Sequence, residues 1–281
     1  MADAGVFRIG FRCPAASVDF AFKAHGGLDY IAGCVRQAGL AAYEAPAPAA
    51  IAAFAQGAAG AVLDVGANTG LFSLLAAAAA PPGTEVHAFE PLAHIRDALL
   101  ANIAENPGLA PRIQVHGVAL SSSAGTATFY ETVNDRGLLT TSSTLEASHA
   151  RMIGGECRRC EVSTVRLDDW AEANLGKQRV KLMKVDVESH EPAVLAGGAR
   201  TIAAHRPMVV LEVLSGTDHG ALDRLRDELR YVDFAMTPTA IRQSVGFRHH
   251  LRGDNHLLCP EERCHEALRF ARENGLAVEF A

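Results

Sequence analysis

The sequence predicts an α/β protein built on a doubly wound, mostly parallel sheet with an antiparallel hairpin at its C-terminal edge. After residue 60, short apolar segments of strand length alternate with longer segments of helical periodicity, a pattern typical of a parallel sheet covered by helices. Hydrophobic residues make up 49% of the 281-residue chain and charged residues 21%, so a large core can be buried. Alanine is abundant and aromatic residues make up only 6%, which favours helices packed on a compact sheet.

Runs of aliphatic and β-branched residues indicate the strands, and apolar residues at helical spacing indicate the helices. Central strands are expected at Ala61–Val65, Glu85–Phe89, Arg112–Val118, Val180–Val185 and Met208–Val213. Helices are expected at Ile51–Ala55, Leu71–Ala80, His94–Glu105 and Pro192–Ala203. Two further apolar segments, Tyr231–Ala235 and Asn255–Cys259, predict the antiparallel hairpin at the edge.

Residues 56–281 are expected to form this domain, and residues 1–55 a helical N-terminal extension. Residues 121–168 differ from their surroundings and are interpreted as an insertion. Two of its segments, Gly125–Glu131 and Cys160–Val165, alternate in a way typical of half-exposed strands. Between them, Asn134–His149 is rich in Thr and Ser and is expected to form a loop. Because loops on the carboxyl side of a parallel sheet commonly face the substrate, this insertion is expected to do so.

Charge and hydropathy exclude several classes of partner. The formal net charge is -6 and no long basic run occurs, whereas sequence-independent nucleic-acid binding needs clustered Lys and Arg. The longest apolar run, Leu74–Ala80, stops at two prolines and is too short to span a bilayer. No secretory signal pattern is recognised at the N-terminus. We therefore expect a cytoplasmic protein that binds neither nucleic acid nor a membrane.

Six cysteines raise the question of a metal site. Cys157 and Cys160 form a CxxC pair, which cannot alone complete tetrahedral zinc coordination. Cys259 and Cys264 could supply the other two ligands, but at an unusual spacing. Reduced free thiols are therefore favoured over structural zinc.

The segment Val62–Gly70 (VLDVGANTG) combines a strand, a glycine-containing turn and a helix start. Gly66 and Gly70 allow a sharp turn and a close approach of the backbone to a ligand, and Asn68 tolerates left-handed backbone angles. The dinucleotide fingerprint G-x-G-x-x-G is absent. A ligand without a pyrophosphate is therefore favoured over a dinucleotide.

S-adenosylmethionine is such a ligand, because it carries an ammonium and a carboxylate in place of a pyrophosphate. Asp64, at the end of the strand, can serve the ammonium directly or through water. Glu90, at the end of the next strand, can accept hydrogen bonds from ribose hydroxyls. The residues predicted to hold the cofactor are Asp64, Gly66, Ala67, Asn68, Gly70, Glu90 and Asp186.

Five segments, in this order, resemble the FkbM family of S-adenosylmethionine-dependent methyltransferases. They are DVGANTGLFS (64–73), AFEP (88–91), LLANI (99–103), VRLDDW (165–170) and KVDVESHEPAVLAGG (184–198). The resemblance covers about Tyr43–Pro260 and implies a methyltransferase-type Rossmann fold. It also implies O-methylation of sugars, polyketide-type metabolites or other small hydroxylated molecules. The family pattern usually has glycine where this chain has Ser189.

The segment KVDVESHE places candidate catalytic groups at the carboxyl end of a central strand. Methyl transfer needs an acceptor oxygen held in line and relieved of its proton. His190 is the first candidate for the base, because its ordinary pKa lies near neutrality. Asp186 could orient the acceptor or replace His190, and Glu188 is expected to face the acceptor. Asp186 and Glu212 could instead hold a divalent cation, a less favoured hypothesis because hard cations usually want more oxygen ligands.

The sequence thus predicts a methyltransferase that acts on a hydroxyl of a small molecule or glycan. Two alternatives stay open: a nicotinamide-dependent oxidoreductase, and an inactive module that keeps the cofactor pocket. Neither the acceptor nor the oligomeric state is predicted.

Overall fold

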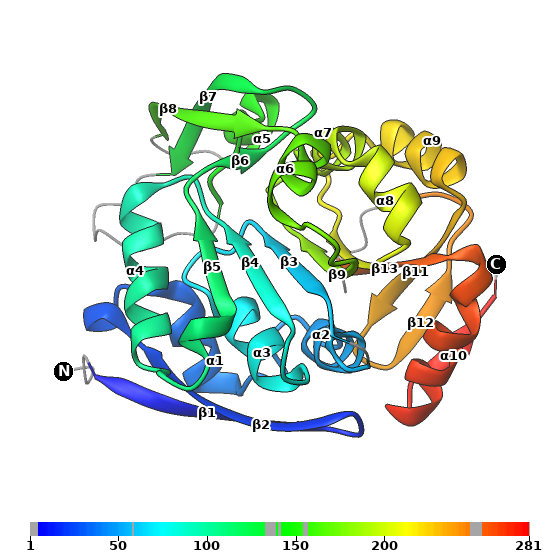
Figure 1. Ribbon diagram of the computed structural model, residues 1–281, viewed down its shortest axis with the longest axis horizontal. Helices are drawn as coiled ribbons and strands as arrows, with labels where there is room; N and C mark the ends of the chain where they lie inside the picture. Colours follow the sequence, from blue (N-terminus) through cyan, green and yellow to red (C-terminus); the bar gives the residue numbers. More distant parts are fainter. Residues whose placement is uncertain are drawn as a thin grey trace.

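The computed structural model describes residues 5–57, 59–132, 139, 142–153, 157–247 and 255–280. A mixed sheet runs through its centre in the strand order β14-β12-β11-β13-β10-β9-β3-β4-β5 (Figure 1). Its parallel part consists of β3 (Ala61–Val65), β4 (Glu85–Phe89), β5 (Ile113–His116), β9 (Val180–Val185) and β10 (Met208–Glu212). The other strands are β11 (Tyr231–Thr237), β12 (Ala240–Gln243), β13 (Asn255–Pro260) and β14 (Ala277–Glu279). The predicted α/β class and mostly parallel sheet are confirmed.

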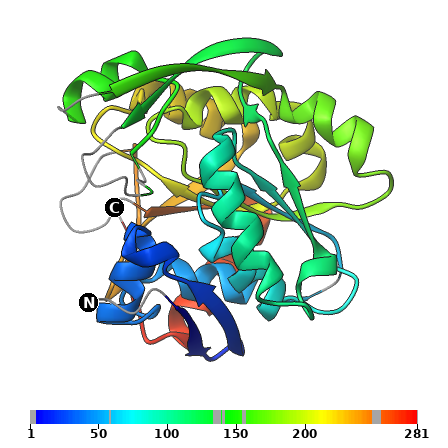
Figure 2. The ribbon, with the colours of Figure 1, turned by 90° about the vertical axis from the view of Figure 1, so that its left-hand side faces the viewer.

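Helices cover both faces of this sheet (Figures 1 and 2). One face carries α2 (Ala47–Ala55), α3 (Leu71–Ala79) and α10 (Cys264–Glu273), with α4 (Ala93–Ala104) beside β5. The opposite face carries α6 (Leu167–Asn174), α7 (Glu191–Gly197), α8 (Ala199–His205) and α9 (His219–Leu229). Short 3₁₀ turns span His25–Gly27, Ala110–Arg112 and Glu261–Arg263. No helix among the described residues is long and apolar enough to cross a membrane.

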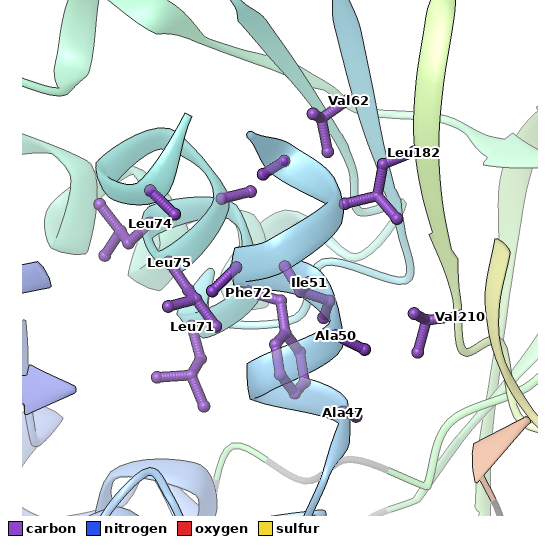
Figure 3. Packing of buried hydrophobic residues seen from close by; sticks show 14 of the residues in the cluster. Ala47, Ala50, Ile51, Val62, Leu71, Phe72, Leu74, Leu75, Leu182 and Val210 are labelled. Atoms are coloured by element: carbon purple, nitrogen blue, oxygen red, sulfur yellow. The ribbon is translucent and has the colours of Figure 1, made fainter. Parts of the chain in front are cut away.

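The central strands are buried on both faces, which explains their continuous apolar runs. On one face, Ile51 of α2 and Leu75 of α3 belong to the same core as Val62 of β3, Leu182 of β9 and Val210 of β10 (Figure 3). This packing fixes the carboxyl ends of β3, β9 and β10 relative to one another, and those ends form the floor of the site.

The N-terminal extension is not helical throughout, so that prediction was wrong for its first half. β1 (Val6–Cys13) and β2 (Ala16–Lys23) form an antiparallel hairpin that precedes α1 (Tyr30–Ala38). The hairpin forms because apolar residues alternate along it: Ile9 and Phe11 on β1, and Phe20 and Phe22 on β2, all turn toward the core. That period of two is the pattern of a strand with one buried face.

The insertion forms a small second sheet above the site. β6 (Ala119–Leu120), β8 (Cys157–Val165) and β7 (Gly125–Thr132) lie in that order, close to the two predicted strands. The expected loop over residues 134–149 is only partly described, since residues 133–138, 140 and 141 lie outside the described part of the chain. Its end is helical: α5 spans Ala147–Ile153.

Two other expectations need correction. β11 and β13 pair antiparallel as predicted, but they do not form the sheet edge, because β13 lies between β10 and β11. Every residue of β13 is buried, so this strand needs a neighbour on each side. The single helix expected over residues 192–203 is two helices, α7 and α8, which meet at Gly198.

Candidate functional site

The carboxyl ends of β3, β4, β9 and β10 border a cavity of about 300 Å³, at the lower end of the usual range for ligand sites. Seven of the sequence-predicted residues line it: Gly66, Ala67, Asn68, Glu90, Asp186, Glu188 and His190. Residues from the N-terminal extension and the insertion complete the wall, among them Tyr43, Glu44, Phe129, Ser143 and Leu145. The polar residues at the strand ends therefore line the same cavity as residues of the N-terminal extension and the insertion.

The glycine loop that follows β3 owes its shape to two glycines. Gly66 has a φ of 81°, and a Cβ there would lie 1.9 Å from the carbonyl oxygen of Asp186. Gly70 has a φ of 92°, and its Cβ would lie 2.3 Å from Leu99 Cδ1. Asn68 takes the left-handed conformation expected of it, with a φ of 48°. Only glycine at position 66 lets the loop lie directly against the end of β9.

Glu90 closes the adjacent side of the cavity. Its Oε2 accepts a hydrogen bond from the amide of Asn68 at 3.2 Å, and its Oε1 accepts one from the amide of Leu92 at 2.9 Å. Burial raises the pKa of Glu90 to about 7, against the opposing effect of these two amides. The carboxylate is therefore held rigidly between the glycine loop and the start of the next segment.

Asp64 and Gly70 are not among the described residues that line the cavity. Asp64 lies beneath the loop, 2% exposed, where Ser73 Oγ donates to its Oδ2 at 2.5 Å. Burial raises the pKa of Asp64, partly offset by the charge of Lys184. The cofactor roles expected for these two residues stay predictions, and the geometry supports an indirect role for both.

A row of charged side chains extends along one face of the sheet at its carboxyl end. Lys184 of β9 is almost fully buried, donates to Asp186 Oδ2 at 2.5 Å and lies 4.7 Å from the centre of the Phe72 ring. Burial opposes the charge of Lys184, but the carboxylates of Asp186 and Glu44 outweigh it and raise the pKa of the lysine. Lys184 in turn keeps the pKa of Asp186 low despite burial. Burial and the charge of Asp186 hold the pKa of Glu212 well above its usual range.

Asp186, Glu188 and Glu212 form the only cluster of three or more close metal-ligating side chains among the described residues. One ligand atom from each lies within 4.8 Å of the others. The CxxC cysteines stand apart from it on β8. Since the ammonium of Lys184 already neutralises Asp186, a divalent cation would compete with that buried pair. The donor set is sufficient in number for a cation, but the built-in charge partner favours a site without one.

The turn after β9 brings Glu188 and His190 to the cavity. Glu188 and Ser189 both have left-handed backbone angles, with φ values of 56° and 79°. Glu191, fully buried, holds this turn: its Oε1 accepts hydrogen bonds from the amides of Val187 and Ser189, each at 3.1 Å. Glu191 is the first residue of α7, and the two amides that it caps lie in the turn before that helix.

His190 lines the cavity, but both of its ring nitrogens are engaged. Nδ1 lies 2.6 Å from Glu146 Oε1, and Nε2 lies 3.0 Å from Ser121 Oγ. The hydrogen bond to His190 lowers the pKa of Glu146, as expected for a carboxylate that accepts from the imidazole. His190 can therefore take a proton from an acceptor only after it gives up the bond to Ser121.

Glu188 is the better placed proton acceptor. Its side chain lines the cavity and is 13% exposed, and its Oε2 lies 3.1 Å from His149 Nε2. Burial raises the pKa of Glu188 to about 7, with the His149 hydrogen bond opposing the rise. A carboxylate whose pKa lies near the working pH is suited to general-base catalysis.

Sequence reasoning missed several of these contacts. Lys184 had a detectable signal, because a lysine inside an apolar central strand needs a buried counter-charge. Glu44 had none, since it lies in an Ala- and Pro-rich segment. Glu146, His149 and Ser121 belong to the insertion, and no local pattern indicates that they fold back onto the turn after β9.

Known proteins share much of this chain. Residues 64–243, more than half of it, match the family described as Methyltransferase FkbM domain. The AMB antimetabolite synthetase AmbE of Pseudomonas aeruginosa is 33% identical over 216 residues, 66% of this chain and 10% of that protein. The chain thus spans about a tenth of the length of this relative.

Solved structures include similar chains. A methyltransferase FkbM from Methylobacillus flagellatus KT has 19% identity and a TM-score of 0.44, with 72% of this chain and 43% of that one covered. The O-methyltransferase TomG from Streptomyces achromogenes, solved with SAM, has 14% identity and a TM-score of 0.44, with 76% and 78% covered.

Proposed function

Because this chain belongs to the FkbM methyltransferase family and is thus an S-adenosylmethionine-dependent methyltransferase, we propose that it methylates a hydroxyl oxygen of a small molecule, with Glu188 as the general base. One observation carries the choice of base. The Glu188 carboxylate faces the cavity beside the glycine loop, and burial places its pKa at about 7.

The lining residues fit the cofactor. Gly66, Ala67 and Asn68 offer a loop without bulky side chains, and the missing Cβ of Gly66 lets this loop lie directly against the backbone of Asp186. Glu90 would accept hydrogen bonds from the ribose hydroxyls, and Asp186 would face the ammonium. Bound S-adenosylmethionine supplies an electrophilic methyl group on a positively charged sulfur.

Glu188 would act on the acceptor. In the transfer, the acceptor oxygen would form a bond to the methyl carbon as the carbon–sulfur bond breaks, and the electron pair would stay on sulfur in S-adenosylhomocysteine. The hydroxyl proton passes to the Glu188 carboxylate. Asp186 is a weaker base, since Lys184 lowers its pKa despite burial, and His190 has both nitrogens engaged. We therefore assign Asp186 and His190 to orientation rather than proton removal.

A small metabolite is favoured as the acceptor. The name of the 33% identical relative describes a synthetase for an antimetabolite, which supports a small metabolite over a macromolecule. The net charge of -6 also disfavours a polyanionic acceptor. Sugars and glycans stay within the same chemistry, because they too present hydroxyl groups.

The test is a transfer assay with S-adenosylmethionine carrying an isotopically labelled methyl group. Hydroxylated amino acids, short hydroxylated peptides and sugars serve as acceptors, and the position of the label is read by mass spectrometry and NMR. We expect label on oxygen, lost with Glu188→Gln and kept with Glu172→Gln, a change at a 79% exposed carboxylate of α6. Label on nitrogen or carbon would refute the proposal, as would cofactor binding with no transfer to any acceptor.

A further inference from the structure

The base proposed above is held by a side chain from the insertion. His149 of α5 is nearly buried; its Nε2 lies 3.1 Å from Glu188 Oε2, and its Nδ1 lies 2.9 Å from Ser189 Oγ. Thr144, earlier in the same segment, donates from Oγ1 to the backbone carbonyl of Glu188 at 2.6 Å. Glu188, His149 and Ser189 thus form one hydrogen-bonded chain, although His149 and Ser189 lie 40 positions apart in the sequence.

Ser189 is an unusual residue for its position. Its φ of 79° lies in the left-handed region, which costs an L-residue other than glycine about 1–2 kcal/mol, and the resemblance noted from the sequence places glycine there. Ser189 is only 4% exposed, and its hydroxyl forms a hydrogen bond with His149. The backbone cost is therefore offset by a contact that glycine cannot make.

The polarity of the chain follows from hydrogen-bonding rules. An ionised carboxylate only accepts, so His149 donates from Nε2–H to Glu188. Neutral imidazole then has a lone pair on Nδ1, which accepts from the hydroxyl of Ser189. The carboxylate thus sets which nitrogen of His149 carries the proton, and the hydroxyl of Ser189, which can donate or accept, pairs with the other nitrogen and holds the ring in place.

Gly216, in a third segment of the chain, packs against these hydrogen-bonded side chains. A Cβ at Gly216, after β10, would lie 3.0 Å from both His149 Nδ1 and Ser189 Oγ. Glycine at this position leaves room for the bond between the two side chains, and any larger residue would press them apart.

We propose that His149 is a positioning residue for Glu188 and that Ser189 holds the imidazole ring in place, so that α5 of the insertion completes the base. This inference rests on the proposed function. The other charges that face Glu188 are Lys184 of β9, Asp186 just after that strand, and Glu212 of β10. Among the groups around Glu188, His149 is the one that hydrogen-bonds its carboxylate directly.

The test uses NMR of the full chain saturated with S-adenosylhomocysteine, with ¹⁵N-labelled histidine and ¹³C-labelled Glu carboxyl groups. We expect wild-type His149 to be the Nε2–H tautomer and Glu188 to titrate near pH 7. His149→Phe should raise the pKa of Glu188, because it removes a donor to the charged form, and His149→Gln should restore part of the difference.

Ser189→Gly and Gly216→Ala keep the test independent of folding. Ser189→Gly suits the backbone angle, so its free energy of unfolding should equal or exceed that of the wild type, while His149 loses one of its two hydrogen bonds and the pKa of Glu188 rises. Gly216→Ala should shift the Glu188 titration in the same direction. An unchanged Glu188 titration in Ser189→Gly, or in both His149 variants, overturns the proposal. Since these signals need no acceptor, they can stand even if no methyl transfer to oxygen is found, and the two failures are distinguishable.

Discussion

The side-chain amide of Asn102 donates to the carbonyl oxygen of Thr69 at 2.8 Å, and so ties α4 to the glycine loop. The other end of the same amide accepts from the backbone amide of Lys23 on β2 at 2.7 Å. Asn102 is fully buried. One side chain therefore links the N-terminal hairpin, a covering helix and the cofactor loop.

Asn102→Leu should lower both stability and cofactor affinity. The substitution is similar in size but leaves the Thr69 carbonyl and the Lys23 amide without their partner, at a cost of about 2–4 kcal/mol. Denaturant unfolding and calorimetric titration with S-adenosylhomocysteine measure the two effects. Gln114→Ala, which removes an exposed amide paired with Glu85, is the control and should change neither. Wild-type affinity in Asn102→Leu would show that the loop does not depend on this link.

Gly66→Ala should abolish cofactor binding through a steric clash rather than through backbone strain alone. Gly83 provides the matched control, because its φ of 83° is nearly that of Gly66 but its Cβ would meet nothing closer than Ala59 Cβ at 3.5 Å. Gly83→Ala should cost about 1 kcal/mol of unfolding free energy, and Gly66→Ala about 3 kcal/mol or more. Equal losses in the two variants would contradict the clash with Asp186.

The sheet could be predicted because each central strand carries its own signal, an apolar run followed by polar residues. Some motif residues have structural rather than chemical roles. Asp168, from VRLDDW, accepts at Oδ1 from the amide and hydroxyl of Thr201, each at 2.8 Å, and so caps α8. Gly198 allows this packing, because its Cβ would lie 2.6 Å from Leu167. The hairpin at residues 6–23 does carry a period-two alternation of apolar residues, which is why this part of the expected helical extension consists of strands.

The site could be predicted only where its residues follow a strand directly. Asn68, Glu90, Asp186 and Glu188 do so, and all line the cavity. His149 reaches Glu188 through the return of a separate segment across 39 positions, a tertiary contact that no local pattern encodes. The sequence therefore indicates candidate residues at the strand ends, and only the fold shows which side chains hydrogen-bond them.

The rate of methyl transfer should rise with pH through about 7. Glu188 must be ionised to accept a proton, and burial raises its pKa to that value, so kcat at saturating cofactor should fall about tenfold per pH unit below it. Glu90 titrates in the same range but should affect the KM for the cofactor. Glu188→Gln should lower kcat by about 10²–10⁴-fold with S-adenosylhomocysteine affinity unchanged. A pH-independent kcat would exclude Glu188 as the base.

Removal of divalent cations should leave the reaction intact. Lys184 already neutralises Asp186 at 2.5 Å, so a chelator should change neither kcat nor the affinity for S-adenosylhomocysteine. Rates measured after dialysis against EDTA, with and without added Mg²⁺ or Mn²⁺, check this. Loss of activity that either cation restores would instead assign Asp186, Glu188 and Glu212 to a metal.

Glu191→Gln should stabilise the protein at alkaline pH. Burial raises the pKa of Glu191 to about 8, so the folded state holds a proton that the unfolded chain releases above about 4.5. Stability from this group is fully present below that value and is lost as pH rises through 8, by up to about 1.4 kcal/mol per pH unit.

Glutamine keeps an oxygen for the amides of Val187 and Ser189 and carries no charge at any pH, although the hydroxyl of Thr217 loses the carboxylate oxygen to which it donates. Urea unfolding at pH 5.5 and 8.5 should therefore show a smaller loss of stability in the variant than in the wild type. Glu172→Gln, at a 79% exposed carboxylate, is the control. It should leave the difference in unfolding free energy between the two pH values unchanged. An equal loss in Glu191→Gln would mean that this carboxyl is already ionised in the folded protein.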